Sequence, residues 1–119
     1  MTGILDGQVA IVTGAGRGIG SAIARRLAHD GAQVMSADLD QVLADAIAAE
    51  VGGIAFAGDL SDDTVAGDLV ARTMARYGRI DILVNNAGGG ILRPFLEHTP
   101  ATLRTTIDRN LWTAVWCCW

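Results

Sequence analysis

The sequence predicts an α/β fold: a doubly wound parallel sheet in which four strands lie in the order 3-2-1-4. Three observations lead to this prediction. Short apolar runs alternate with helical segments, a glycine-rich turn at residues 13–20 joins the first run to the first helix, and Asp38 follows the second run. Strands that alternate with helices pair in parallel through right-handed crossovers. We expect residues 1–119 to form a single domain that ends before a fifth strand.

Apolar periodicity and helix-ending residues define the individual elements. The expected strands are residues 8–13, 33–37, 54–57 and 80–85. The expected helices are residues 19–31, 40–51 and 62–77, followed by a last helix that begins at residues 99–100. In the first helix Ile19, Ile23 and Leu27 recur at four-residue spacing, and glycines end the second and third helices.

The last helix begins with Thr99 as its N-cap and Pro100 at the first helical position. Its second half, residues 111–119, is apolar nearly all round. One stripe comprises Trp112, Trp116 and Trp119, and the other comprises Leu111, Val115 and Cys118. A helix with two apolar faces must be buried on both. We therefore expect core packing and subunit contact, with an aromatic ligand site as the less favoured alternative.

Composition excludes several classes of protein. The 119 residues carry a net charge of -4, and nine basic residues are scattered among thirteen acidic ones, so no basic stripe for nucleic acid is present. No apolar run approaches the roughly 20 residues of a spanning helix, and the N-terminus lacks the regions of a signal peptide. We expect a cytoplasmic chain with no membrane partner. The adjacent Cys117 and Cys118 make neither a disulfide framework nor a metal site, and we interpret both as small buried residues.

The turn at residues 13–20 has the pattern T-G-x-x-x-G-x-G. Gly14, Gly18 and Gly20 allow a sharp turn and a close approach to the backbone, and Arg17 and Ile19 lie between them. A strand that turns sharply into a helix presents N–H groups and the positive end of the helix dipole to a pyrophosphate. The pattern therefore predicts a Rossmann-type site for a dinucleotide.

Asp38 indicates which dinucleotide the site prefers. A carboxylate at the end of the second strand accepts hydrogen bonds from the adenosine ribose hydroxyls and repels a 2′-phosphate. Leu39 beside it adds no positive charge, which favours NAD over NADP, although Arg17 could pair with a phosphate. The structural alternative for Asp38 is a helix N-cap, for which Asp40 is at least as well placed.

The glycine-rich turn and Asp38 are two of several motifs by which the chain resembles the short-chain dehydrogenase/reductase family, over essentially its whole length. The further matching segments are Asp59-Leu60, Asn85-Asn86-Ala87-Gly88 and Asn110-Leu111. The resemblance implies that Asp59 and Leu60 contact the adenine ring and that Asn86, Ala87 and Gly88 line the cofactor. It also implies that Asn110 supports the catalytic proton relay. Structural alternatives are a strand end for Asp59, turn formers at Asn86 and Gly88, and a backbone-bonded helix residue at Asn110.

The chain departs from the family in its proton chemistry. Family members continue with a serine and a Tyr-x-x-x-Lys pair, whereas this sequence has no lysine and its only tyrosine, Tyr77, lies in an expected surface helix. We therefore expect the N-terminal, cofactor-binding half of an oxidoreductase that transfers hydride between nicotinamide and an alcohol or ketone, inactive alone. The alternatives are a non-catalytic nucleotide-binding or assembly module and an inactive truncated fragment.

Two weaker expectations concern substrate and assembly. Residues 113–118 and the glycine loop before the last helix resemble, faintly, members that oxidise cis-dihydrodiols of aromatic acids. The strand at residues 82–85 would be a sheet edge although its apolar run is typical of a strand covered on both faces. An exposed apolar edge templates pairing with another chain, so we expect a homo-oligomer.

Overall fold

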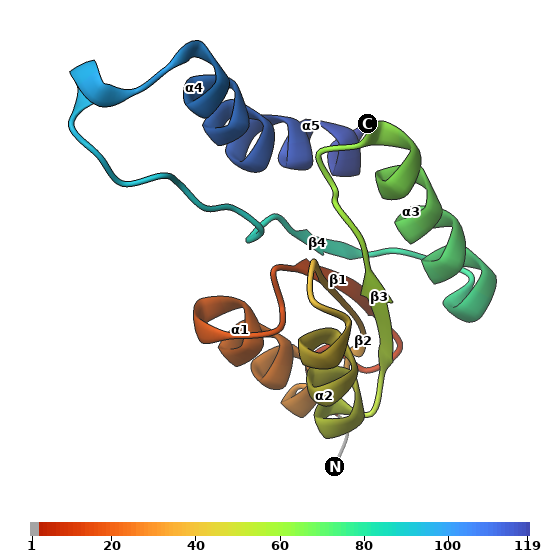
Figure 1. Cartoon of the computed structure of the whole chain (residues 1–119). Coiled ribbons are helices and arrows are strands. Elements are labelled where there is room, and N and C mark those ends of the chain that lie inside the picture. The colour runs from red at the N-terminus through yellow and green to blue at the C-terminus, as the bar shows by residue number, and fades with distance from the viewer. Residues whose placement is uncertain (1–2) are drawn as a thin grey trace.

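A single parallel sheet of four strands, in the order β3-β2-β1-β4, organises the molecule (Figure 1). This computed structural model describes residues 3–119; Met1 and Thr2, part of the segment in which we expect no signal peptide, lie outside the described residues. The strands are β1 (Val9–Thr13), β2 (Gln33–Asp38), β3 (Ile54–Ala57) and β4 (Ile82–Val84). In the central register Ile11 pairs with Met35 on one side and with Leu83 on the other. The predicted fold class and strand order are confirmed.

Helices cover both faces of the sheet. On one face lie α1 (Gly18–His29) and α2 (Gln41–Val51), and on the other lie α3 (Asp63–Tyr77) and α5 (Thr113–Cys118), as Figure 1 shows. A short 3-10 turn, η1 (Phe95–Glu97), precedes α4 (Pro100–Ile107), which continues through a π-helical segment, η2 (Asp108–Trp112), into α5. The long connection from β4 to α4 projects from the body, and the molecule measures 55 × 25 × 24 Å.

Side-chain caps fix the starts of three helices. Asp40 Oδ1 accepts from the N–H groups of Val42 and Leu43 at the start of α2, and Asp62 Oδ1 accepts from the N–H of Thr64 at the start of α3. At α4 the Thr99 hydroxyl oxygen accepts from the Thr102 N–H in a capping box, with proline at the first position as predicted. These local signals explain why the helix starts are close to their predicted places.

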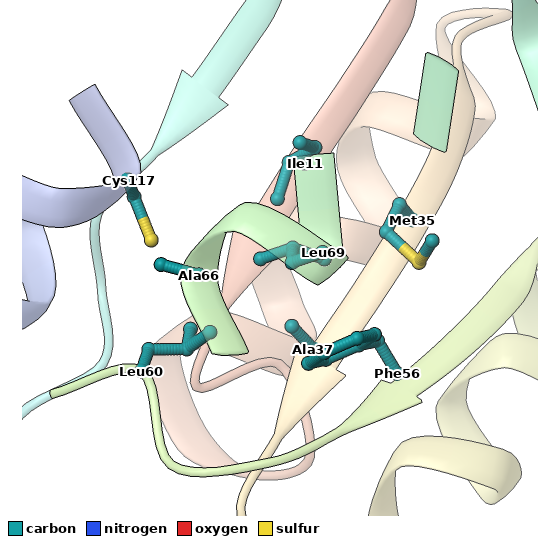
Figure 2. Close-up of a cluster of buried hydrophobic side chains, with 8 residues drawn as sticks. All are labelled: Ile11, Met35, Ala37, Phe56, Leu60, Ala66, Leu69 and Cys117. Atoms are coloured by element: carbon teal, nitrogen blue, oxygen red, sulfur yellow. The ribbon is translucent and has the colours of Figure 1, made fainter. Parts of the chain in front are cut away.

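The sheet is buried on both faces because its central strands are apolar on both. Every residue of β1 is buried. Ile11 contributes to the cluster on the α3 face, and Val12 to the cluster beneath α1 and α2. Figure 2 shows the first cluster, whose members are Ile11, Met35, Ala37, Phe56, Leu60, Ala66, Leu69 and Cys117. This packing holds the carboxyl ends of β1 and β2 rigidly beside each other.

The last helix is more exposed in the single chain than its apolar faces suggest, and the expected burial of Cys118 is wrong. The two apolar faces of residues 111–119 are not both buried: Trp119 is 91% and Leu111 54% exposed. The tryptophan stripe exists, since Trp112 stacks on Trp116 at 5.0 Å and Trp116 meets Trp119 edge-on. Cys117 is buried but Cys118 is exposed. Ile19, the first residue of the four-residue spacing in α1, is 74% exposed.

The strand β4 is shorter than its apolar run suggests and is only half-buried. It pairs with β1 on one side and is the edge of the sheet. Within residues 3–119 no helix combines the length and the apolar character that crossing a membrane requires.

Candidate functional site

The glycine-rich turn brings β1 and α1 close together. Gly14 has a φ of +62° and Gly18 a φ of +57°, a region that residues with a side chain rarely adopt. A Cβ added at Gly20 would lie 2.0 Å from the Gly14 carbonyl oxygen and 2.5 Å from Asn86 Nδ2. The turn is tied to β2 by the Ala15 N–H, which donates to the Ala37 carbonyl at 2.9 Å. The glycines at positions 14, 18 and 20 are therefore required by the backbone itself.

The N-terminus of α1 differs from those of the three capped helices. Its N-cap residue, Arg17, is extended and makes no side-chain cap, and its first turn contains no acidic residue. The first N–H groups of a helix need partners, and they carry the positive end of its dipole. A Cβ built at Gly18 would meet nothing within 4 Å, so the backbone there adjoins open space. Uncapped donors beside open space fit an anionic group such as a phosphate.

The carboxylate of Asp38 is held at the end of β2 by backbone donors. Its Oδ2 accepts from the Gly16 N–H at 2.9 Å, and its Oδ1 accepts from the Asp40 N–H at 3.0 Å. The Asp38 carbonyl also accepts from the Gly58 N–H. The helix cap here is Asp40, as its position in the sequence suggested. Asp38 is thus fixed beside the glycine-rich turn, with no helix to cap.

A buried hydroxyl joins the loop after β4 to the glycine-rich turn. Thr13 Oγ1 accepts from the N–H groups of Asn86 at 3.1 Å and Ala87 at 2.9 Å, and it donates to the Val84 carbonyl at 3.3 Å. Asn86 Nδ2 donates to the Gly14 carbonyl. In the sequence Thr13 is only the first residue of the T-G-x-x-x-G-x-G pattern. A hydroxyl at the end of an otherwise apolar buried strand is the signal that could have indicated this link.

Asn110 fastens the same loop to the last helix. Its Nδ2 donates to the carbonyls of Gly89 at 2.6 Å and Thr106 at 2.8 Å, and its Oδ1 accepts from the Gly89 N–H at 3.3 Å. A Cβ added at Gly88 would lie 2.7 Å from this Oδ1, so the loop and the helix touch here. Asn110 belongs to the π-helical segment, a kind of irregularity that is frequent at functional sites.

These segments surround one pocket of about 450 Å³. The predicted residues that line it are Gly14, Arg17, Asp38, Leu39, Asp59, Leu60, Asn86, Ala87 and Gly88. Its other lining residues, Asp40, Gly58, Arg109 and Thr113, were not predicted. Four predicted residues are not part of the lining: Gly18, Ile19, Gly20 and Asn110. The structure thus brings four separate motifs to the carboxyl edge of the sheet.

The charges of the pocket divide into held carboxylates and unpaired guanidinium groups. Asp59 Oδ1 accepts from the N–H and the hydroxyl of Ser61, and the Asp38 and Asp40 carboxylates likewise accept from backbone N–H groups. Arg17 and Arg109 have no ion pair or side-chain hydrogen bond within residues 3–119. In the same part of the chain, no group of three or more His, Cys, Asp or Glu is arranged to hold a metal ion. The lining can therefore supply cations to an anionic ligand.

Side chains able to donate or accept a proton in catalysis are scarce around the pocket. Tyr77 lies at the end of α3 with the Arg76 guanidinium over its ring, and it does not line the pocket. Burial raises the pKa of the Cys117 thiol, which disfavours the thiolate needed for nucleophilic attack. The 119 residues include no lysine.

Comparison with known proteins places this arrangement in a family. The family described as short chain dehydrogenase matches the chain over residues 8–119. The chain is 51% identical to a 2,3-dihydroxy-2,3-dihydro-p-cumate dehydrogenase of Pseudomonas putida, over 95% of this chain and 46% of that protein. It is 39% identical to a 1,6-dihydroxycyclohexa-2,4-diene-1-carboxylate dehydrogenase of Acinetobacter baylyi, over 93% of this chain and 44% of that protein.

A solved structure is similar to this one along nearly the whole chain. It is a 3-ketoacyl-(acyl-carrier-protein) reductase from Brucella melitensis complexed with NADH, with a TM-score of 0.91 and 30% sequence identity. The match covers 96% of this chain and 48% of the reductase. The chain therefore spans about half the length of the relatives it matches.

Proposed function

The chain belongs to the short chain dehydrogenase family, and from this premise we propose that it binds a nicotinamide dinucleotide, with NAD preferred to NADP. The observation that carries the proposal is that Arg17, the N-cap residue of α1, which makes no side-chain cap, and the fixed carboxylate of Asp38 line the same pocket. The first suits a phosphate and the second suits ribose hydroxyls. One ligand that contains both groups would satisfy both parts of the pocket.

The residues divide between the parts of the cofactor. Gly14, Gly18, Ile19 and Gly20 would present backbone to the pyrophosphate, and Arg17 would add positive charge. Asp38 and Leu39 would face the adenosine ribose. Asp59 and Leu60 would border the adenine, and Asn86, Ala87 and Gly88 would border the rest of the cofactor. When bound, the nicotinamide would supply a hydride acceptor or donor, and this chain's residues would bind and orient it.

The preference for NAD follows from charge. A 2′-phosphate would lie against the Asp38 carboxylate, whose position is fixed by the Gly16 and Asp40 N–H groups. Leu39, 69% exposed, offers no cation at that place. Arg17 or Arg109 would have to offset the repulsion, and an exposed cation is a weak partner in water. Asp38 therefore outweighs Arg17 in our proposal.

Calorimetric titration of the 119-residue chain with NADH and NADPH tests the assignment. We expect the parent chain to bind NADH at least tenfold more tightly than NADPH. Asp38→Asn should reduce the difference in binding free energy between the two cofactors by roughly 1 to 3 kcal/mol, the cost of one lost polar partner. The matched control is Asp45→Asn, a carboxylate on the exposed side of α2 that bonds only Gln41 Nε2. Equal affinities for the two cofactors in the parent chain would overturn the assignment.

We further propose that the whole protein oxidises an alcohol, and that the 119-residue chain alone does not. The chain has no lysine, and its one tyrosine is not part of the pocket. Asn110 would act as a positioning residue, since it fixes the loop at Gly89 against the last helix. The measurement is the NADH absorbance band over a panel of secondary alcohols. Turnover that survives purification and disappears in Gly18→Trp would contradict this proposal.

For the substrate we propose a cis-diol of a cyclohexadiene carboxylate. Two relatives, 51% and 39% identical, are named for dihydroxylated ring acids. The glycine loop after β4 and residues 113–118 are the parts of this chain that would adjoin such a substrate. Titration of the NAD-saturated chain with a cis-dihydroxycyclohexadiene carboxylate, and with an open-chain polyol as comparison, tests the choice. Tighter binding of the polyol would refute it.

A further inference from the structure

Arg109 lies on one face of the last helix, in η2, and this face continues through α5 from the pocket to the core. Arg109, Thr113 and Cys117 follow each other at four-residue spacing, and the Thr113 hydroxyl donates to the Arg109 carbonyl at 2.9 Å. At the inner end Cys117 is buried with Leu60 and Ala66, as Figure 2 shows. Thr113 is buried and lines the pocket, and Arg109 lines it one turn further out. Arg109 therefore lies on the α3 and α5 side of the pocket, beyond Leu60.

Two other segments meet Arg109 at this side of the pocket. The Arg109 carbonyl oxygen lies 3.9 Å from the place that a Cβ at Gly88 would take. Asp59 and Leu60, which follow β3, line the same pocket. Under the proposed function these two residues border the adenine. Arg109 thus shares with Asp59 and Leu60 a pocket whose lining the last helix completes.

The chemistry of Arg109 suits a flat aromatic base. Its guanidinium is exposed and has no ion pair within residues 3–119, whereas Arg25 and Arg79 pair with Glu50 and Asp81. The carboxylate of Asp59, which lines the same pocket, is held by Ser61. A planar guanidinium stacks on aromatic faces, and its positive charge is attracted to the π electrons.

We propose that Arg109 determines cofactor affinity at the adenine end, by stacking its guanidinium on the base. This inference rests on the proposed function and goes beyond it, because it assigns the last helix a direct part in binding the adenosine moiety. The proposal distinguishes the two halves of the cofactor, because Arg109 would contact the adenosine half and not the nicotinamide nucleotide.

The test compares three ligands with the full 119-residue chain by calorimetry: NADH, ADP-ribose and reduced nicotinamide mononucleotide. We expect Arg109→Gln to weaken NADH and ADP-ribose roughly three- to thirty-fold, the range of a cation–π contact. Arg109→Lys keeps the charge without the planar group and should fall between the parent and Arg109→Gln. Binding of the mononucleotide should not change. Arg104→Gln, an exposed arginine of α4 outside the pocket, is the matched control.

Each outcome has one meaning. If the parent binds neither NADH nor ADP-ribose, the proposed function fails, and this inference fails with it. If the parent binds both and Arg109→Gln binds them equally well, only the inference fails. In a parallel titration with NADPH, a loss of affinity confined to that cofactor would instead show that Arg109 pairs with the 2′-phosphate, and would overturn stacking. Unchanged circular dichroism and melting temperature of Arg109→Gln exclude a folding defect as the cause of lost affinity.

Discussion

Gly20 offers the sharpest test of the close contact between α1 and the glycine-rich turn. A Cβ at this position would lie 2.0 Å from the Gly14 carbonyl oxygen, about 1 Å inside the 3.0 Å limit that real Cβ atoms respect. The obstructing atom belongs to the backbone, so no side-chain rotation relieves the contact. Overpacking costs typically about 1 to 3 kcal/mol, and a backbone obstacle places Gly20→Ala near the upper end. We expect the free energy of unfolding to fall by roughly 2 to 3 kcal/mol.

A second helical glycine provides the matched control. Gly67 lies in α3, and a Cβ there would meet nothing within 4 Å. Gly67→Ala should therefore raise the free energy of unfolding by about 1 kcal/mol, because alanine is the better helix former. Urea unfolding followed by circular dichroism measures both variants, with unchanged m-values as the sign that only stability differs. If Gly20→Ala is as stable as the parent chain, the close approach of α1 to Gly14 is not real.

Three further predictions concern groups outside the pocket. Ser36 Oγ is buried without a hydrogen-bond partner in the described chain. Ser36→Ala should therefore raise the free energy of unfolding by about 1 kcal/mol, which a higher urea midpoint would show. The Arg79 guanidinium lowers the pKa of Asp81 below its ordinary value of 3.8. The stability that this ion pair contributes is therefore present above pH 3.8 and is lost as the pH falls through the lowered pKa. The difference in melting temperature between the parent chain and Arg79→Gln should accordingly shrink as the pH falls through that range. A thiol reagent should modify exposed Cys118 fast and buried Cys117 slowly, and Cys118→Ser should remove the fast phase; two equal rates would contradict the burial difference.

Much of the fold could be predicted because its signals are local. The strand at residues 54–57 has its predicted bounds, and Asp40 caps α2 as its place after Asp38 suggested. The fourth strand shows where local signals end. Residues 80–85 are apolar enough for a strand, but only Ile82–Val84 pair with β1. The Asn86 N–H turns back to the Val84 carbonyl and to Thr13 Oγ1, so the chain leaves the sheet there.

The rest of the site depends on contacts between distant segments. Arg109 and Thr113 reach the pocket because α5 packs on α3, which no spacing in the sequence reveals. The π-helical segment is equally hidden, since it leaves the apolar pattern of the last helix intact. The exposure of Cys118 was predictable. Adjacent residues of a helix point about 100° apart, so Cys117 and Cys118 could not both face the core.

Amide chemical shifts of the isotope-labelled chain test whether the uncapped N-terminus of α1 binds the phosphates of a dinucleotide. On addition of NADH we predict the largest shifts at the amides of Gly18, Ile19 and Gly20, which have no side-chain cap. The Thr102 amide at the start of α4 is already bonded to the Thr99 side chain, and neither residue lines the pocket, so this amide should move little and serve as an internal reference. Shifts confined to α4 and α5, or the absence of shifts at saturating NADH, would contradict the claim.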